Sequence, residues 1–447
     1  MGIRLWKLAK KNMRKSNSWL NSSAIILLMS LASTEVLGQT AEPDSGNERS
    51  DISVLMDEVV VTARERKESL QDVPLAITGL SSAQIEAKKI RSLDDLTVGI
   101  PNVSFDDVGT TPGTAKFSIR GLGINSSIPS IDPTVGTFVD GVYIGTNSGL
   151  VFDIFDLEGI EVLRGPQGTL FGRNVTGGAV LLKTKKPGDE VKTRIQLALK
   201  GGGDGGLNTY IKGSVGGPVS DVLALKLFAY FNDDQGWFEN DFDGERFGAR
   251  QQLMLRPMLV WSPSDQSELI LRYEYSDVDG DGPAGQSHTN GSGIPGSPAN
   301  FERDSFNFSI DNRGYVDVET HFATAEYNQS VGDSGQITNI FGYRKLSQDT
   351  LTDLDAQPLT LFDGRFQLES EQVSNELRYA GKIGEAVDIV AGLYYFKNDI
   401  ICAEGRNIFG GALTQDGGGE YSVESFASFV SSDYALNDDW TLSTGLR

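Results

Sequence analysis

The sequence predicts a membrane β-barrel preceded by a compact α+β domain. Three observations predict this class. Segments from about residue 191 onward alternate apolar and polar residues, and their connections alternate between tight turns and long polar loops. The N-terminus is basic and then apolar, which is typical of an exported protein.

The first 38 residues have the pattern of a secretory signal peptide. Six basic residues precede the apolar run 24–32, and small residues end at Gly38, where we expect cleavage. That run of nine residues rises only about 14 Å as a helix, against a hydrocarbon layer roughly 30 Å thick. We therefore expect the segment to be removed rather than retained in a membrane.

Composition excludes several classes of function. A net charge of −22 argues against a nucleic-acid partner. The one cysteine, Cys402, excludes an internal disulfide, and two histidines, His288 and His321, do not support a histidine-rich metal or haem site. No triad or cysteine–histidine pair can be placed in the sequence, so we expect neither enzyme activity nor a cofactor.

The barrel strands are identified by an alternation of period two. In 268–275, Leu269, Leu271, Tyr273 and Tyr275 are apolar and most residues between them are polar, as a strand between lipid and a wet lumen requires. Eleven strands are expected, at 191–200, 208–216, 222–232, 251–261, 267–276, 316–331, 335–347, 366–380, 386–398, 421–435 and 439–447.

The connections between these strands alternate in length. Tight turns are expected at 217–221, 262–266, 332–335, 381–385 and 436–438. The other connections are long polar loops at 233–250, 277–315, 348–365 and 398–420, and a short glycine-rich loop at 201–207. This parity places the turns at one end of a barrel and the loops at the other, whereas a soluble β-sandwich would show no such parity.

Residues 64–187 have a different pattern. Ser81 with Gln84, and Ser92 with Asp95, resemble helix-capping pairs and predict short helices at 82–90 and 93–98. A β-rich run follows up to residue 187. About 120 residues are enough for a core of their own, and the segment is too polar to span a bilayer, so we expect a compact α+β domain.

Five stretches resemble a known family. They read DEVVVTARERKESLQDVPLAITGLSSAQIE, DLTVGIPNVSF, FSIRGLG, FVDGVYIG and IEVLRGPQGTLFGRNVTGGAVLLKTKKP. Over residues 57–187 they resemble the TonB box and plug domain of TonB-dependent outer-membrane receptors, and the last motif is highly specific. The resemblance implies a membrane β-barrel of the 22-stranded type, with about eleven strands present here and an N-terminal α+β plug domain inside the barrel.

The resemblance also divides the chain. It implies a signal peptide at 1–38, a periplasmic tether at 39–70 with the TonB box at 57–63, a plug domain at 71–187, and the N-terminal half of a barrel at 190–447. Half a barrel leaves two open edges that lipid cannot satisfy. We therefore expect either roughly 250–300 further residues, scaled from the strands counted here, or the product of a truncated gene.

Two sets of site residues follow from the resemblance. The TonB box, which TonB would grip, consists of Asp57, Glu58, Val59, Val60, Val61, Thr62 and Ala63. Its valines favour extended backbone that can add to a partner's sheet, although an ordinary edge strand of the plug is the alternative. The plug motif and plug–barrel contacts would consist of Arg120, Gly121, Arg164, Gly165, Pro166, Gly172, Asn174, Gly177 and Gly178.

The glycine motifs and an aspartate-rich segment each have an alternative interpretation. The glycines do not form a phosphate-binding loop, because no Gly-Lys-Ser/Thr follows them, and the two arginines could instead be solvated surface residues. A weak calcium candidate consists of Asp277, Asp279 and Asp281, but its twelfth position is His288 rather than glutamate.

The function that the resemblance implies is active import through the outer membrane of a Gram-negative bacterium. TonB, with ExbB and ExbD in the inner membrane, would supply the work, and outer-membrane lipid would surround the barrel. A ferric siderophore is the first expectation for the small-molecule ligand, with cobalamin or an oligosaccharide as alternatives. A passive plugged porin, a non-transporting binding or sensing protein, and a truncated non-functional product remain the competing hypotheses.

Overall fold

The computed structural model describes residues 60–447, except for 67, 72, 91, 110, 127, 151–155, 202–204, 289–300, 303–304, 385 and 438. The expected signal peptide and residues 57–59 of the expected TonB box lie outside the described residues. Nowhere in the described part of the chain is a helix both long and apolar enough to cross a membrane.

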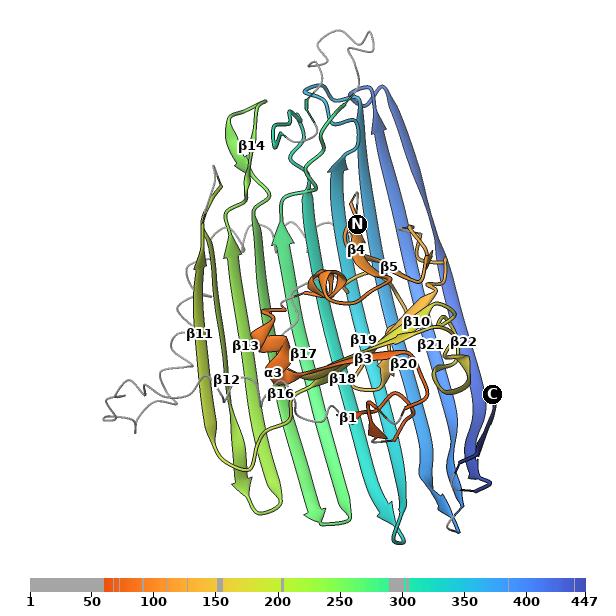
Figure 1. The fold of residues 1–447 in the computed structure, drawn as a ribbon. Coiled ribbons are helices and arrows are strands. Elements are labelled where there is room, and N and C mark those ends of the chain that lie inside the picture. Colours follow the sequence, from red (N-terminus) through yellow and green to blue (C-terminus); the bar gives the residue numbers. More distant parts are fainter. Residues whose placement is uncertain are drawn as a thin grey trace, which may run out of the picture. The chain divides into compact units, whose positions relative to one another are not determined.

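An antiparallel sheet forms the larger part of the described chain, and its eleven strands pair in sequence order (Figure 1). Each of the eleven strands expected from the alternation is present in it. They are β11 (Lys192–Lys200), β12 (Asn208–Ser220), β13 (Leu223–Asp234), β16 (Arg250–Ser264), β17 (Ser267–Gly280), β18 (Tyr315–Val331), β19 (Gly335–Asp353), β20 (Phe362–Ile383), β21 (Val387–Ile408), β22 (Leu413–Ala435) and β23 (Thr441–Leu446).

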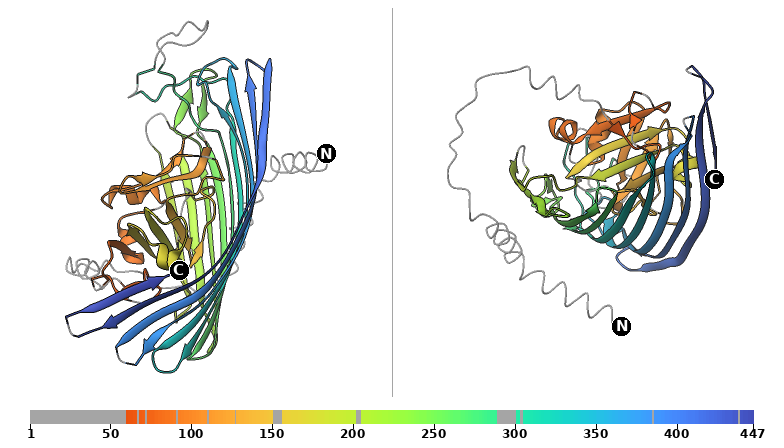
Figure 2. Two further views of the ribbon diagram at one scale, coloured as in Figure 1. Left: turned by 90° about the vertical axis from the view of Figure 1, so that its right-hand side faces the viewer. Right: turned by 90° about the horizontal axis from the view of Figure 1, so that it is seen from below.

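Burial alternates along these strands. On β18, Val316, Val318, Thr320 and Phe322 are buried, and the residues that alternate with them are half-buried. The buried side chains face the concave side of the sheet, where the α+β domain lies (Figure 2). Large apolar residues such as Phe341 and Leu377 are exposed on the convex side, as a lipid-facing surface requires.

Aromatic residues form two rows on the convex side. Trp261 and Tyr327 lie near the tight turns, and Tyr273 and Tyr343 lie further along β17 and β19. Aromatic girdles of this kind flank the apolar band of a membrane barrel. After Tyr343 the residues of β19 on the same face are Lys345, Ser347 and Asp349, so this strand leaves the apolar band there and continues toward the long connections.

Two segments that were expected to be loops are largely strands. β21 and β22 run through most of 398–420, with Ile408 opposite Leu413 at the tip, and β19 and β20 extend into 348–365. Outside the lipid a strand needs no apolar face, because main-chain hydrogen bonds hold the pair together. The prediction of loops from polar composition was therefore wrong for these two segments. The expected loop 233–250 contains a small hairpin of β14 (Phe238–Asn240) and β15 (Glu245–Phe247).

The α+β domain contains two sheets. A five-stranded sheet has the order β3-β9-β10-β7-β8, and a three-stranded sheet has the order β4-β5-β6. Their strands are β3 (Ile77–Ser81), β4 (Val103–Val108), β5 (Thr111–Ile119), β6 (Leu122–Gly123), β7 (Val135–Val139), β8 (Val142–Tyr143), β9 (Leu157–Arg164) and β10 (Gly178–Thr184). β9 therefore lies between β3 and β10, inside the sheet.

The helices of this domain are short. α3 (Ser82–Ala87) begins with a full capping box between Ser81 and Gln84, which confirms the first predicted cap. The second predicted helix is a 3₁₀ helix, η1 (Asp94–Val98), in which the Asp95 carboxylate accepts a hydrogen bond from the amide of Ser92. A third helix, α4 (Gly168–Phe171), lies within the predicted plug motif.

The core of the α+β domain packs between its two sheets and η1. Leu93, Ile119, Ile160, Val162 and Val180 are at most 1% exposed and belong to one apolar cluster. Burying each such side chain contributes roughly 1.5–3 kcal/mol. This core holds β9 and β10 in place, and these strands carry the residues described next.

Candidate functional site

The last residues of the expected TonB box form a small hairpin with the chain that follows them. β1 (Val60–Val61) pairs with β2 (Glu68–Ser69), with Val61 opposite Glu68. Val61 and Ala63 are each 1% exposed. The segment is extended, as expected, but its strand is not free. The pairing partner follows the strand instead of preceding it, and for this reason the sequence analysis missed it.

Thr62 attaches this hairpin to the five-stranded sheet. Its amide and its hydroxyl both donate to Oε1 of Glu161 on β9, at 2.8 and 2.9 Å. The other carboxylate oxygen, Oε2, is buried without a hydrogen-bond partner in the described chain. Burial raises the pKa of Glu161, against the lowering effect of the hydrogen bonds from Thr62.

Charged residues after Thr62 connect the same segment to the large sheet. Arg64 and Arg66 both pair with Asp433 of β22, with Arg66 at 2.5 Å. Glu65 pairs with Arg378 of β20 at 2.5 Å. Residues 62–66 therefore contact both the α+β domain and the sheet that surrounds it.

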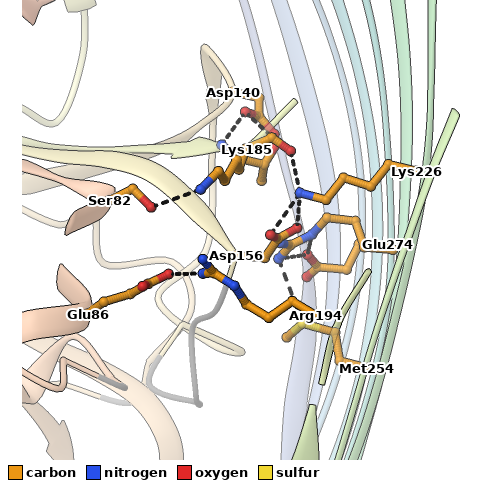
Figure 3. A network of polar contacts seen from close by, with 11 residues as sticks. Ser82, Glu86, Asp140, Asp156, Lys185, Arg194, Lys226, Met254 and Glu274 are labelled. Atoms are coloured by element: carbon orange, nitrogen blue, oxygen red, sulfur yellow. Dashed lines mark hydrogen bonds and ion pairs between the residues drawn. The ribbon is translucent and has the colours of Figure 1, made fainter. Parts of the chain in front are cut away.

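Further ion pairs join the α+β domain to the sheet at other points (Figure 3). Lys226 of β13 pairs with Asp156 at 2.7 Å and donates to the carbonyl of Lys185 at 2.8 Å. Arg194 of β11 forms an ion pair with Glu86 of α3. The side chains of Lys226 and Asp156 are 7% and 10% exposed, so water screens this pair little.

Arg120 and Arg164, which were expected to contact the barrel wall, do not make these connections. Within the described chain, the ion pairs with the sheet come from other residues, such as Asp156. Arg120 is exposed at a left-handed turn (φ 55°), and its Nη1 lies 3.3 Å from the point where a Cβ on Gly165 would be. Arg164 lies on β9 opposite Gly178. Neither arginine forms an ion pair with the part of the sheet that the structure describes.

The glycine-rich motif makes tight turns around α4. The amide of Gly165 donates to the carbonyl of Gly177, and Gly172 ends α4 with a positive φ of 77°. Gly178 has a φ of 154°, and a Cβ there would lie 2.2 Å from the carbonyl oxygen of Leu163. Two of the other predicted residues are exposed: Gly121 in the turn between β5 and β6, and Pro166 just before α4.

A small hollow of about 20 Å³ lies between the α+β domain and β21–β22. Tyr143, Arg173 and Asn174 line one side, and Asn398 and Tyr421 line the other. Asn174 donates to the hydroxyl of Tyr143 at 2.8 Å, and burial raises the pKa of Tyr143 to about 12. The hollow thus combines neutral aromatic and amide groups with the ion pair of Arg173 and Asp132, at 2.6 Å.

The weak calcium candidate is not assembled. Asp277 and Asp279 lie on β17, and Asp281, just beyond that strand, accepts hydrogen bonds from the amides of Gly248 and Ala249 at 3.0 Å. Asp281 also pairs with Arg313 at 3.0 Å. The DxDxDG pattern is the end of a strand here, so its carboxylates do not turn around one point as in a calcium loop.

Comparison with protein families decides the identity of the fold. A model described as the TonB-dependent receptor plug domain matches residues 69–179, and a model of the TonB-dependent receptor-like β-barrel matches residues 258–447. The chain belongs to the TonB-dependent receptor family. It is an outer-membrane protein, with its α+β domain as the plug and its large sheet as barrel wall.

Curated relatives of this receptor match over part of their length. The iron-regulated outer membrane virulence protein of Vibrio cholerae is 28% identical over 182 residues, which cover 38% of this chain and 26% of that protein. The ferrioxamine B receptor of Salmonella typhimurium is 25% identical over 229 residues, 50% of this chain and 29% of that receptor. The match thus spans less than a third of either relative.

Solved structures show the same fold. The siderophore receptor PiuA from Acinetobacter baumannii matches with a TM-score of 0.67 and 16% identity, over 85% of this chain and 58% of that one. The ferric yersiniabactin uptake receptor FyuA from Yersinia pestis matches with a TM-score of 0.57 and 16% identity, over 83% and 64%.

Several important residues of the receptor were missed by sequence reasoning. Glu161 lies inside the recognised motif IEVLRGP, but its partner Thr62 is 99 positions away. Asp433 and Arg378 belong to barrel strands on which polar inward-facing residues are common. A pattern of charge in one strand does not reveal which part of the plug it faces.

Proposed function

We propose that this receptor imports a ferric siderophore actively, through force that TonB applies to residues 57–63 and that the plug receives. The observation that carries the proposal is the attachment of Thr62 to Glu161, because it joins the motif resembling a TonB box to a strand inside the plug sheet. A pull on the box would act directly on β9.

The contacts around the box support a stepwise release. Thr62 to Glu161 is a charge-assisted contact, and Arg64 and Arg66 hold the same segment to Asp433 of the barrel. Breaking hydrogen bonds to a charged group costs about 1.5–3 kcal/mol each. Such contacts hold residues 62–66 in place when no force is applied, and they break when TonB pulls on the segment. A path beside or through the plug then opens.

TonB, energised by ExbB and ExbD, is the partner that fits this segment. Val60 and Val61 are already extended, and once β2 is displaced their main chain can add to the sheet of a partner. Proline at Val60 removes an amide donor from that edge.

The siderophore substrate is supported by the relatives. Two matched proteins are named for ferrioxamine B and for iron regulation. Cobalamin is the second candidate, because the vitamin B12 transporter BtuB of Vibrio vulnificus is 29% identical over 128 residues.

Binding of the purified C-terminal domain of TonB to this chain in detergent tests the coupling. We expect Val60→Pro to abolish binding and Val60→Ile, which keeps the amide, to preserve it. Equal binding by both variants would reject the coupling and favour a passive porin.

Ferric ferrioxamine B and cobalamin, titrated separately into the same chain, test the substrate. Quenching of tryptophan fluorescence by the iron chelate would support a siderophore as the substrate. Quenching by cobalamin alone would favour cobalamin as the substrate instead.

A further inference from the structure

Three polar residues face one another across the loop-side ends of β19, β20 and β21. Asp353 lies directly opposite Asp363, and Asp363 lies directly opposite Asn407. Residues directly opposite in a sheet have Cβ atoms about 4.5–5.5 Å apart, and like charges at such positions are destabilising. The two aspartates therefore require a neutralising partner.

This row of residues lies outside both the lipid and the lumen. Asp353 follows Tyr343 of the aromatic row on the same strand, roughly 33 Å further along it. Gln372, which bonds to the amide of Gly145 in the plug, faces the lumen. Asp363 is an odd number of residues from Gln372 in an unbroken strand, so it points to the opposite face.

The carboxylates are buried and incompletely bonded. Asp353 and Asp363 are each 5% exposed. Among the described residues, Oδ2 of Asp353, Oδ1 of Asp363, Oδ1 of Asn407 and Oδ1 of nearby Asp311 are buried oxygens without a hydrogen-bond partner. Leaving a buried carboxylate oxygen unpaired is costly, so three such oxygens, with the neutral amide oxygen of Asn407 beside them, point to a missing positive group.

Basic side chains nearby do not fill this need. The charged groups that act on Asp353 are the carboxylates of Asp355 and Asp311, and Asp311 also acts on Asp363. Arg365, two positions after Asp363, pairs with Asp349 at 2.7 Å.

We propose that Asp353, Asp363, Asn407 and Asp311 bind one calcium ion. All the unpaired atoms are oxygens, which hard cations prefer, and no sulfur or imidazole belongs to the group. Calcium accepts irregular arrangements of six to eight oxygens, whereas magnesium requires a nearly ideal octahedron. As the described side chains stand, no three carboxylates are gathered around one point, so Asp311 must turn inward about its side-chain torsions.

The ion would fasten two covering segments to the sheet. Asp311 accepts a hydrogen bond from the hydroxyl of Thr360, in the connection between β19 and β20. Asp353 also accepts one from the amide of Ala356, in the same connection, at 2.9 Å. Calcium thus holds residues 354–361 and the segment before β18 in place. This inference does not depend on the transport proposal.

Isothermal titration of CaCl₂ into the purified, EDTA-treated chain in detergent tests the site. We expect one bound ion with a Kd of about 10⁻⁴ M or tighter, in the range of extracellular calcium sites or below it. Asp363→Asn should weaken binding at least about tenfold. Asp349→Asn is the matched control, because Asp349 lies on the same strand and face as Asp353 but already pairs with Arg365.

Thermal melting and proteolysis distinguish a variant that has lost calcium binding from one that fails to fold. Asp353→Asn relieves the repulsion, so without calcium it should melt at or above the wild-type temperature and should no longer gain stability from calcium. Calcium should also slow chymotryptic cleavage between Leu354 and Phe362 in the wild type but not in Asp353→Asn. Absence of saturable binding, or equal binding by Asp363→Asn and Asp349→Asn, would overturn the site. Loss of binding in Asp281→Asn instead would move it to the end of β17.

Discussion

Thr62 donates two hydrogen bonds to one oxygen of Glu161, from its amide at 2.8 Å and from its hydroxyl at 2.9 Å. Thr62 belongs to the motif that resembles a TonB box, and Glu161 belongs to β9 inside the plug sheet. The two residues are 99 positions apart, so the contact exists only in the folded plug. In the coupling proposed above, Glu161 is the place where movement of the box would reach the plug.

Replacing Glu161 by alanine should release this segment. Glu161→Ala removes an acceptor of two charge-assisted hydrogen bonds, worth about 1.5–3 kcal/mol each. Hydrogen exchange at the Thr62 amide should accelerate by about tenfold or more, since 1.4 kcal/mol corresponds to a factor of ten. Glu158→Ala, on the same strand but paired with Lys183 at the surface, is the control and should leave that exchange unchanged.

The same contact should respond to pH. Burial raises the pKa of Glu161 above its ordinary value of 4.5, while the bonds from Thr62 oppose the shift. A carboxyl with a raised pKa binds its proton more tightly in the folded state, so the folded plug should gain stability as pH falls through that pKa toward 4.5 and lose it as pH rises again. Oε2 has no partner in the described chain and can carry the proton while Oε1 still accepts.

Thermal melting of the chain in detergent at several pH values, compared with Glu161→Gln, measures this dependence. Glu161→Gln cannot ionise, so the wild type should gain stability relative to that variant as pH falls through the raised pKa. A relative loss of stability on acidification would contradict the assignment.

Much of the barrel wall could be predicted because the alternation of buried and outward-facing residues is visible within each strand. On β18, alternate burial of Val316, Val318 and Phe322 follows directly from the order of residues. The outer parts of β21 and β22 could not be predicted in this way. Residues 413–420 carry no apolar stripe, and pairing with β21 holds them in the sheet. Outside the lipid, main-chain partners define a strand, and a single segment does not reveal its partner.

The site was predictable at the level of motifs but not of contacts. Ser81 and Gln84 formed their cap because both lie within one helical turn. Arg120 and Arg164 were expected at the barrel wall, yet the plug brings Arg120 close to Gly165 instead. The pair of Lys226 with Asp156 had no sequence signal, because it depends on how the plug fits the curved sheet.

That buried pair predicts a strong effect on stability. Lys226→Met leaves the Asp156 carboxylate buried without its partner, which costs about 3–5 kcal/mol. Adding Asp156→Asn should recover much of the loss, because asparagine is neutral and tolerates the φ of 60° at that position. Calorimetric melting of the chain in detergent measures both effects. Lys192→Met, whose side chain is 77% exposed, should melt like the wild type.

Gly178 offers a test of how the plug is built. Its φ of 154° is disfavoured for other residues, and a Cβ would lie 2.2 Å from the carbonyl oxygen of Leu163, well inside contact distance. Gly178 pairs with Arg164 on β9 and with Val135 on β7, so a displacement there would disturb both neighbours of β10. We expect Gly178→Ala to lower the melting temperature of the plug and to expose Glu161 and Thr62 to exchange. Gly188→Ala, where a Cβ meets nothing within 4 Å, should change neither, and equal behaviour of the two variants would show that the close approach at Gly178 does not constrain the plug.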